Sequence, residues 1–105
     1  LQGVRSGAAT SYRQLYTADA VEVELMVERS GRVRRVEGDL IADERGGRNE
    51  SALVELVDAR NHPVHAAETD KNGLFRFDSV TPGTYRMVVT RAESAAIEIE
   101  ALEIA

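Results

Sequence analysis

The chain has 105 residues, of which 43% are hydrophobic and 30% are charged, and this composition is that of one globular domain rather than a disordered segment. The formal net charge of -5 disfavours bulk binding to nucleic acid, because an acidic chain repels the phosphate backbone. Cysteine is absent, which excludes disulfides and thiolate chemistry, and no apolar run approaches the roughly 20 residues that span a bilayer. We see no signal peptide, and because the first residue is Leu1 rather than Met we expect a piece of a longer protein.

Residues 1–19 show no clean hydrophobic period, and we interpret them as an N-terminal extension or linker ahead of one domain over residues 20–105. Tyr12, Leu15 and Tyr16 of this extension are expected to pack on the domain. The only regular structure that we consider in this extension is a short helix over residues 12–16.

The rest of the chain has the period of two that is typical of strands, with turn residues between the segments. Gly38 lies inside a predicted strand and indicates a bulge or a close backbone approach. Ala101 breaks the alternation of the last strand, which predicts a second bulge. A polar loop is expected over residues 43–49. The pattern predicts an all-β, antiparallel sandwich with seven strands, over residues 21–28, 32–43, 52–57, 64–69, 74–78, 85–89 and 95–104.

One sequence pattern with four parts extends over these strands. V-x-G-x-L at residues 36–40 and A-x-V-x-L-x-D at 52–58 precede A-x-T-D-x-x-G-x-F-x-F at 67–77 and V-x-P-G-x-Y at 80–85. The pattern resembles the carboxypeptidase regulatory-like domain, which is close to the Cna B-type and prealbumin-like sandwiches. The resemblance covers roughly residues 33 to 104. It implies a Greek-key β-sandwich that serves larger proteins as a folding, spacer or interaction module.

The turns of the motif have a physical basis. Gly73 and Gly83 are expected to supply the positive φ that tight turns need, and Asp70 can accept hydrogen bonds from the backbone of its own turn. Asn61 and His62 stand where the family usually has a glycine, which predicts a left-handed Asn61.

A shorter pattern concerns the context of the domain. R-Q-L-Y at residues 13–16, followed by VEVELMVE and V-x-G-D-L, is similar to C-terminal regions of bacterial proteins encoded beside extracytoplasmic-function sigma factors. This similarity implies a cytoplasmic module of a regulatory protein. The alternative location is the cell envelope or the extracellular space.

Patterns that suggest bond-forming or metal chemistry are interpreted as structural. Some Cna B-type domains form an internal Lys–Asn bond, but the only lysine, Lys71, lies in a predicted loop, which leaves Glu55 with no lysine to activate. Asp70 opens what looks like half of a calcium loop, and the residues after it lack the further oxygen ligands. His62 and His65 would point to opposite faces of an extended chain, so we expect exposed loop histidines rather than a metal site.

We find no catalytic constellation, and we predict a non-enzyme without cofactor or metal. A nucleophile-elbow motif is absent, and the tail EIEALEIA lacks the residues used by transthyretin-related hydrolases. A cluster of four arginines on the first hairpin has two interpretations, a solvated face paired with Glu22, Glu24 or Glu28, or a docking patch for an acidic protein partner. Its members are Arg29, Arg32, Arg34 and Arg35.

The sequence therefore predicts a non-catalytic accessory module of a larger bacterial protein that makes protein contacts, in sigma-factor-linked regulation. The alternative is an extracellular structural or carbohydrate-binding repeat of a surface or transport protein. We expect a protein partner, no nucleic acid and no direct insertion into a membrane.

Overall fold

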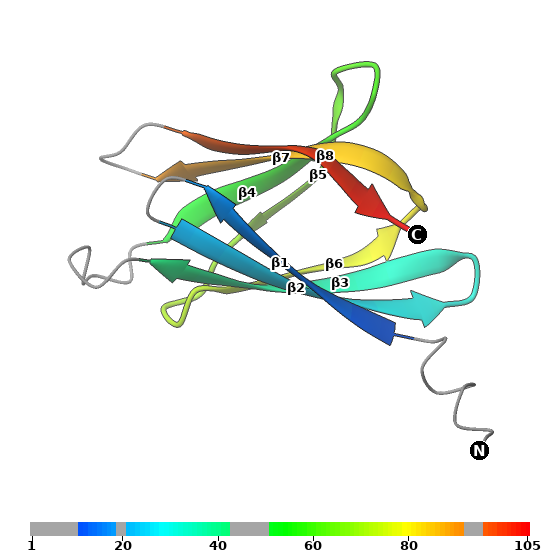
Figure 1. The fold of residues 1–105 in the computed structure, drawn as a ribbon, viewed down its shortest axis with the longest axis horizontal. Helices are drawn as coiled ribbons and strands as arrows, with labels where there is room; N and C mark the ends of the chain where they lie inside the picture. Colours follow the sequence, from blue (N-terminus) through cyan, green and yellow to red (C-terminus); the bar gives the residue numbers. More distant parts are fainter. Residues whose placement is uncertain (1–10, 19–20, 43–50, 92–95) are drawn as a thin grey trace.

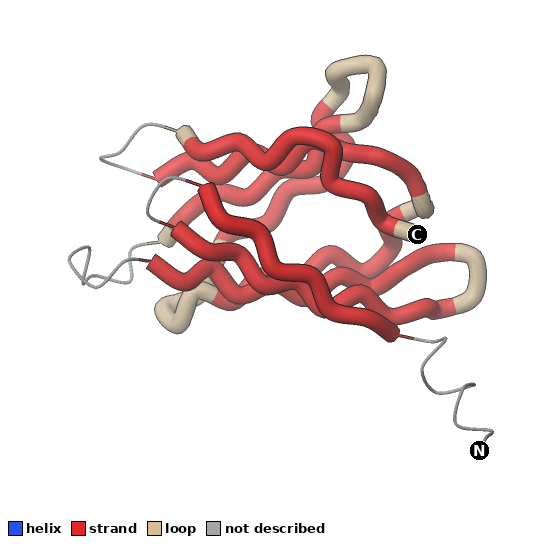
Figure 2. The backbone as a smooth tube through the Cα atoms, in the orientation of Figure 1, coloured by secondary structure: helices blue, strands red, loops and turns tan. Residues whose placement is uncertain are grey.

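The computed structural model describes residues 11–18, 21–42, 51–91 and 96–105, and this part of the chain consists of strands, turns and loops without a helix (Figure 1, Figure 2). No described helix is therefore long and apolar enough to cross a membrane. The predicted polar loop at residues 43–49 lies outside the described residues. The eight described strands are β1 (Ser11–Ala18), β2 (Val21–Ser30), β3 (Val33–Ala42), β4 (Ala52–Val57), β5 (Pro63–Glu68), β6 (Leu74–Val80), β7 (Gly83–Arg91) and β8 (Ile97–Ile104).

The strands form two four-stranded antiparallel sheets that face one another, with the order β1-β2-β3-β6 in sheet A and β5-β4-β7-β8 in sheet B (Figure 1). The chain crosses between the sheets, since β3 and β6 are neighbours in sheet A while β4 and β5 form a hairpin in sheet B. The predicted all-β antiparallel sandwich is thus confirmed.

The predicted number of seven strands is wrong, because Ser11–Ala18 forms β1 where we considered only a short helix. β1 pairs with β2 along its whole length, from Ser11 opposite Glu28 to Ala18 opposite Val21. Its inward positions alternate regularly, but they include a glutamine, so the hydrophobic pattern is too weak to indicate a strand. Leu15 points outward and is exposed, contrary to the expected packing on the domain. The boundary at residue 20 stays a prediction.

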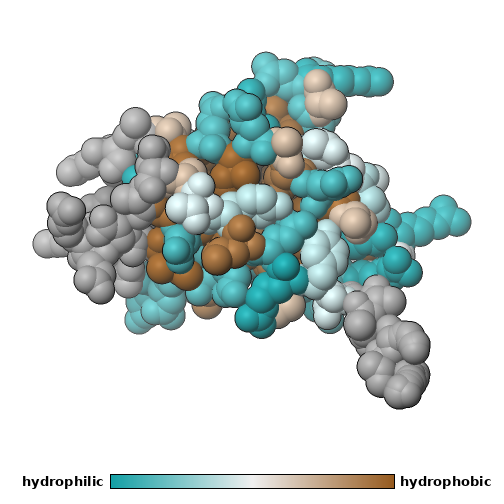
Figure 3. All heavy atoms as spheres, viewed as in Figure 1, coloured by the Kyte–Doolittle hydropathy of each residue, from teal (hydrophilic) through white to brown (hydrophobic). Residues whose placement is uncertain are grey.

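The core lies between the two sheets, and its buried members are alternate side chains of β2, β3, β4, β6, β7 and β8. The half-buried Ala67 of β5 packs against them. In Figure 3, hydrophobic residues are visible between hydrophilic ones. Tyr12, Tyr16 and Ala18 of β1 pack against this core from its margin. The buried members are Val21, Val23, Leu25, Val27, Val36, Ala52, Val54, Leu56, Phe75, Phe77, Val80, Tyr85, Met87, Val89, Ile97, Ile99, Leu102 and Ile104.

Two irregular positions can be compared with the sequence. A side chain on Gly38 would overlap the ring of Phe75, which is its partner on β6, so the group close to this glycine is a side chain and not the backbone that the sequence predicts. Ala101 has a φ of 59°, and the pairing of β7 with β8 shifts from Tyr85–Leu102 to Met87–Ile99 across it. This predicted bulge returns the end of β8 to the core.

The turns agree with the sequence at two of three predicted positions. Asn61 has a φ of 69° and Gly73 a φ of 84°, as expected for turn residues. Gly83 does not take a positive φ, which corrects the prediction for that turn, because it already belongs to β7 and pairs with Ile104.

Candidate functional site

The first candidate site is the arginine hairpin, which we define as Arg29, Arg32, Arg34 and Arg35 at the end of β2 and the start of β3. Gly31 has a φ of 67° and allows a tight turn, which places Arg29 directly opposite Arg34. Arg35 belongs to the other face of the sheet, where it forms an ion pair of 3.2 Å with Glu28. The four side chains are therefore divided between two faces and the turn.

The arginines of the hairpin also differ in what they bind. The Nε of Arg34 donates a hydrogen bond of 2.7 Å to the Ala105 carbonyl, and its Nη1 donates one of 3.0 Å to Val33. Arg29 and Arg32 are exposed, and among the described residues they form no ion pair. A guanidinium in this position can bind a carboxylate through two parallel hydrogen bonds. Arg34 is thus engaged within the domain, whereas Arg29 and Arg32 form no ion pair with the described residues.

The turn after β5 is held by the carboxylate of Asp70. Its Oδ1 accepts hydrogen bonds from the backbone N–H groups of Asn72 at 2.8 Å and Leu74 at 3.0 Å. The bond from Leu74, followed by that from Asn72, lowers the pKa of Asp70 below its usual value. This oxygen thus serves the turn. In the described part of the chain, no group of three or more His, Cys, Asp or Glu side chains could hold a metal ion.

The turn after β4 is likewise held by an aspartate carboxylate. Asp58 accepts hydrogen bonds of 2.9 Å from the N–H groups of Arg60 and His62, and these bonds, that from His62 first, lower its pKa. Arg86 of β7 donates a hydrogen bond of 2.7 Å to the side-chain oxygen of Asn61. The turn is thereby fixed to sheet B.

The two histidines lie in different environments. His62 is exposed in the turn, as predicted. His65 was expected to be exposed too, and this is wrong because it lies on β5 at an inward position opposite Leu56. Its ring is half-buried against Phe77, with 5.7 Å between the ring centroids, and burial lowers the pKa of His65.

The two residues considered for an internal crosslink lie in different elements. Lys71 is exposed in the turn after β5, as the sequence indicates. Glu55 lies on β4, opposite Ala66 and Val88. Lys71 is therefore a loop residue, and Glu55 is a strand residue of sheet B.

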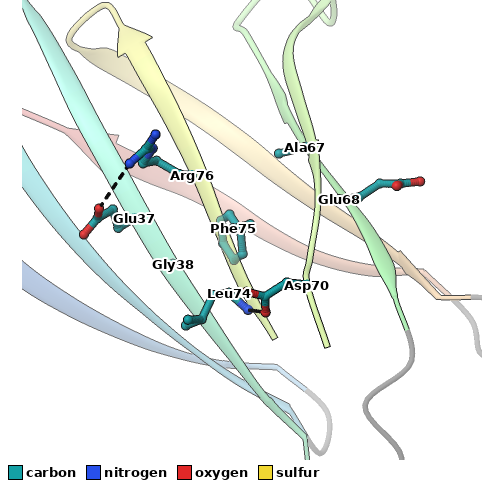
Figure 4. A pocket seen from close by; sticks show the side chains of 8 residues that line it. All are labelled: Glu37, Gly38, Ala67, Glu68, Asp70, Leu74, Phe75 and Arg76. Atoms are coloured by element: carbon teal, nitrogen blue, oxygen red, sulfur yellow. Dashed lines mark hydrogen bonds and ion pairs between the residues drawn. The ribbon is translucent and has the colours of Figure 1, made fainter. Parts of the chain in front are cut away.

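A cleft of about 480 Å³ opens where β3 and β6 of sheet A approach β5 of sheet B (Figure 4). Phe75 lies over Gly38 at its base, and Arg76 and Glu37 form an ion pair of 4.0 Å at one margin. The other residues around the opening are Ala67, Glu68, Asp70 and Leu74. Sequence reasoning missed the cleft because its lining comes from four separate segments, and Gly38 was the only local signal.

The fold and these turns define the class first: the chain is a two-sheet antiparallel sandwich consistent with the prealbumin-like type. The profile of the carboxypeptidase regulatory-like domain matches residues 30–105, and the chain belongs to this family. The family is one of non-catalytic modules, which indicates an accessory domain. No curated protein and no solved structure matches the chain significantly.

Proposed function

We propose that the chain is an accessory domain that makes protein contacts for a larger bacterial protein, with Arg29 and Arg32 of the arginine hairpin binding an acidic partner. The observation that supports this role most directly is the state of these two side chains. Both are exposed at the end of the sandwich and form no ion pair among the described residues, whereas Arg34 and Arg35 of the same hairpin are engaged.

Electrostatics favours an acidic partner at this place. Arg29 lies directly opposite Arg34 in the register, and like charges that face one another across two strands are unfavourable. A carboxylate of a partner would relieve this repulsion and would gain charge-assisted hydrogen bonds. The protein contact would therefore form most readily with a surface rich in Asp and Glu.

The environment of the aromatic residues supports a protein contact over a carbohydrate site. Phe75, Phe77 and Tyr85 are buried, and Tyr12 and Tyr16 are half-buried at the margin of the core. These five are all the aromatic residues of the chain, so no fully exposed ring is available for stacking on a sugar.

For the biological context we propose cytoplasmic regulation linked to an extracytoplasmic-function sigma factor. The support is the R-Q-L-Y pattern of residues 13–16 and its similarity to proteins encoded beside such factors. In the fold this segment lies in β1, directly beside β2. The partner in this proposal is a cytoplasmic protein with an acidic surface.

The test is an affinity purification of the full-length protein from its source cell, with mass spectrometry of the bound proteins. The variant Arg29→Glu/Arg32→Glu reverses the two available charges, and Arg60→Glu in the turn after β4 is the matched exposed control. We expect a cytoplasmic protein, such as a sigma factor, to bind wild type and the control and to be lost from the double variant. Recovery of envelope components only, or equal binding by all three proteins, would overturn the proposal.

A further inference from the structure

The outer face of sheet A carries an excess of acidic side chains. We define the acidic face as the outward side chains of β1, β2, β3 and β6, which alternate with the core residues of the same strands. It has three guanidinium groups, from Arg13, Arg35 and Arg76. It has six carboxylates, from Glu22, Glu24, Glu28, Glu37, Asp39 and Asp78.

The three guanidinium groups of this face are already engaged. Arg13 pairs with Glu24 at 3.3 Å, and Arg35 pairs with Glu28 at 3.2 Å. Arg76 pairs with both Asp78, at 3.0 Å, and Glu37, at 4.0 Å. Within the described residues this leaves Glu22 and Asp39 without an ion pair. Among the described residues, the negative charge of the acidic face is therefore not fully neutralised.

One row of side chains crosses the whole face. The register aligns Leu15 of β1 with Glu24 of β2, Glu24 with Asp39 of β3, and Asp39 with Leu74 of β6. Two carboxylates thus face one another in the middle, an arrangement that is unfavourable in a sheet. Burial, and then the charges of Glu24 and Asp70, raise the pKa of Asp39. Within the described residues Glu24 is paired with Arg13 and Asp39 has no such partner, so a further cation above the row would act mainly on Asp39.

Both ends of the row are apolar and open to solvent. Leu15 is 60% exposed and Leu74 is 47% exposed, and they are the two most exposed large hydrophobic side chains of the described part. A hollow of about 200 Å³ beside the row is lined by Leu74, both central carboxylates, the half-buried Met26, and Arg13, whose guanidinium pairs with Glu24. Across the sheet, the row therefore presents an apolar side chain, two carboxylates and a second apolar side chain.

We propose that the acidic face docks an amphipathic helix of a partner protein in which one Arg or Lys lies between two apolar side chains, four positions away on either side. Strands are about 4.8 Å apart, so the two leucines of the row lie about 7 Å to either side of its centre. Four residues of a helix rise about 6 Å, which matches this distance. The helix would place its cation over Glu24 and Asp39 and its apolar side chains on Leu15 and Leu74.

The same charges argue against the other occupants of a sheet face. A second copy of the chain would bring an identical excess of carboxylates to the contact, and the two faces would repel one another. An extended segment gains its main-chain hydrogen bonds at the edge of a sheet, whereas an exposed face is covered by a packed element such as a helix. The row from Leu15 to Leu74 contains none of the four arginines of the hairpin, so the inference stands independently of the proposed function.

The test uses a synthetic helical peptide of about 20 residues, long enough to form a helix in water, with Leu, Arg and Leu at successive intervals of four positions. A matched peptide carries Glu in place of Arg. Each is titrated into the whole ¹⁵N-labelled chain, and the amide shifts are followed by NMR. We expect the Arg peptide to shift the amides of the row, and the Glu peptide to bind at least about tenfold more weakly.

Two variants decide whether the row is the site. Asp39→Asn keeps the shape of the side chain, relieves the repulsion with Glu24, and should weaken the Arg peptide about tenfold. Glu98→Gln removes one carboxylate from β8 of sheet B and should leave its affinity unchanged, as should Arg29→Glu/Arg32→Glu. Equal binding of the two peptides, or unchanged binding of the Arg peptide to Asp39→Asn, would overturn the proposal.

Discussion

The two open sides of the sandwich, where an edge strand of one sheet meets an edge strand of the other, are closed in different ways. Between β5 and β6 the contact is aromatic: His65 packs on Phe77, and Phe77 packs on Phe75 with 5.8 Å between the centroids. Between β1 and β8 the contact is polar. There the hydroxyl of Tyr12 accepts a hydrogen bond of 2.8 Å from the N–H of Ala105, and Gln14 donates one of 3.2 Å to the Glu103 carbonyl.

The difference shows that one fold uses two sources of stability on its two sides. The β5–β6 side depends on buried aromatic area from within the matched family residues, where a ring pair adds about 0.5–1.5 kcal/mol beyond its burial. The β1–β8 side depends on hydrogen bonds worth about 1 kcal/mol each, and on a strand that precedes the matched residues 30–105. Nearly all of β2 precedes the matched residues as well, so β1 and β2 together complete a sandwich whose other strands lie within the family match.

The largest expected effect comes from removing β1. A chain that begins at residue 19 loses the ladder with β2 and the half-buried rings of Tyr12 and Tyr16, and we expect its free energy of unfolding to fall by about 3 kcal/mol or more. Urea denaturation followed by circular dichroism measures this loss. A chain that begins at Ser11 keeps β1 and is the matched control. If both chains unfold at the same urea concentration, the predicted domain boundary at residue 20 is right and β1 is dispensable.

A smaller effect is expected on the aromatic side from Gly38→Ala. The new methyl group would overlap the ring of Phe75, and forcing extra volume into a packed core costs about 1–3 kcal/mol. Gly31→Ala is the matched control, because apart from the adjoining residues no atom lies within 4 Å of the added methyl group, and only the φ of 67° opposes a side chain, at a cost of about 1 kcal/mol.

The double variant Gly38→Ala/Phe75→Leu identifies the source of the loss at Gly38. If the clash with the ring is the cause, the two substitutions together cost less than the sum of their separate costs, because each changes the same contact. Additive costs would show that Gly38 matters for its backbone and not for the aromatic side.

The same two sides show what could be predicted from sequence. Phe75 and Phe77 lie in a motif with a strict period of two, so their strand, their burial and the turn at Gly73 followed from local pattern. The bulge at Ala101 also followed, since the apolar positions change parity there. β1 did not, because its inward side chains include the polar Gln14, whose partner is a carbonyl almost 90 positions away in the chain.

The candidate sites were predictable only to the same local extent. The pairing of Arg35 with Glu28 was expected from the hairpin, but the contact of Arg34 with Ala105 joins two distant ends of the chain. The row from Leu15 to Leu74 combines four strands, and its register depends on β1, which the sequence did not indicate. A surface built across a sheet requires the strand order, which no single segment encodes.

The smallest expected effect is a pH dependence confined to the aromatic side. Burial lowers the pKa of His65, so the unfolded chain takes up a proton at a higher pH than the folded chain. Stability is therefore fully present above the unfolded value of about 6.5 and decreases as the pH falls from that value toward the lower folded pKa. His65→Gln removes this dependence, while His62→Gln at the exposed neighbour keeps it. Urea midpoints measured between about pH 7.5 and pH 5 distinguish the two variants. An equal slope for wild type and His65→Gln would mean that the β5–β6 side tolerates a charged imidazole, and the contrast between the two sides would then rest on the phenylalanines alone.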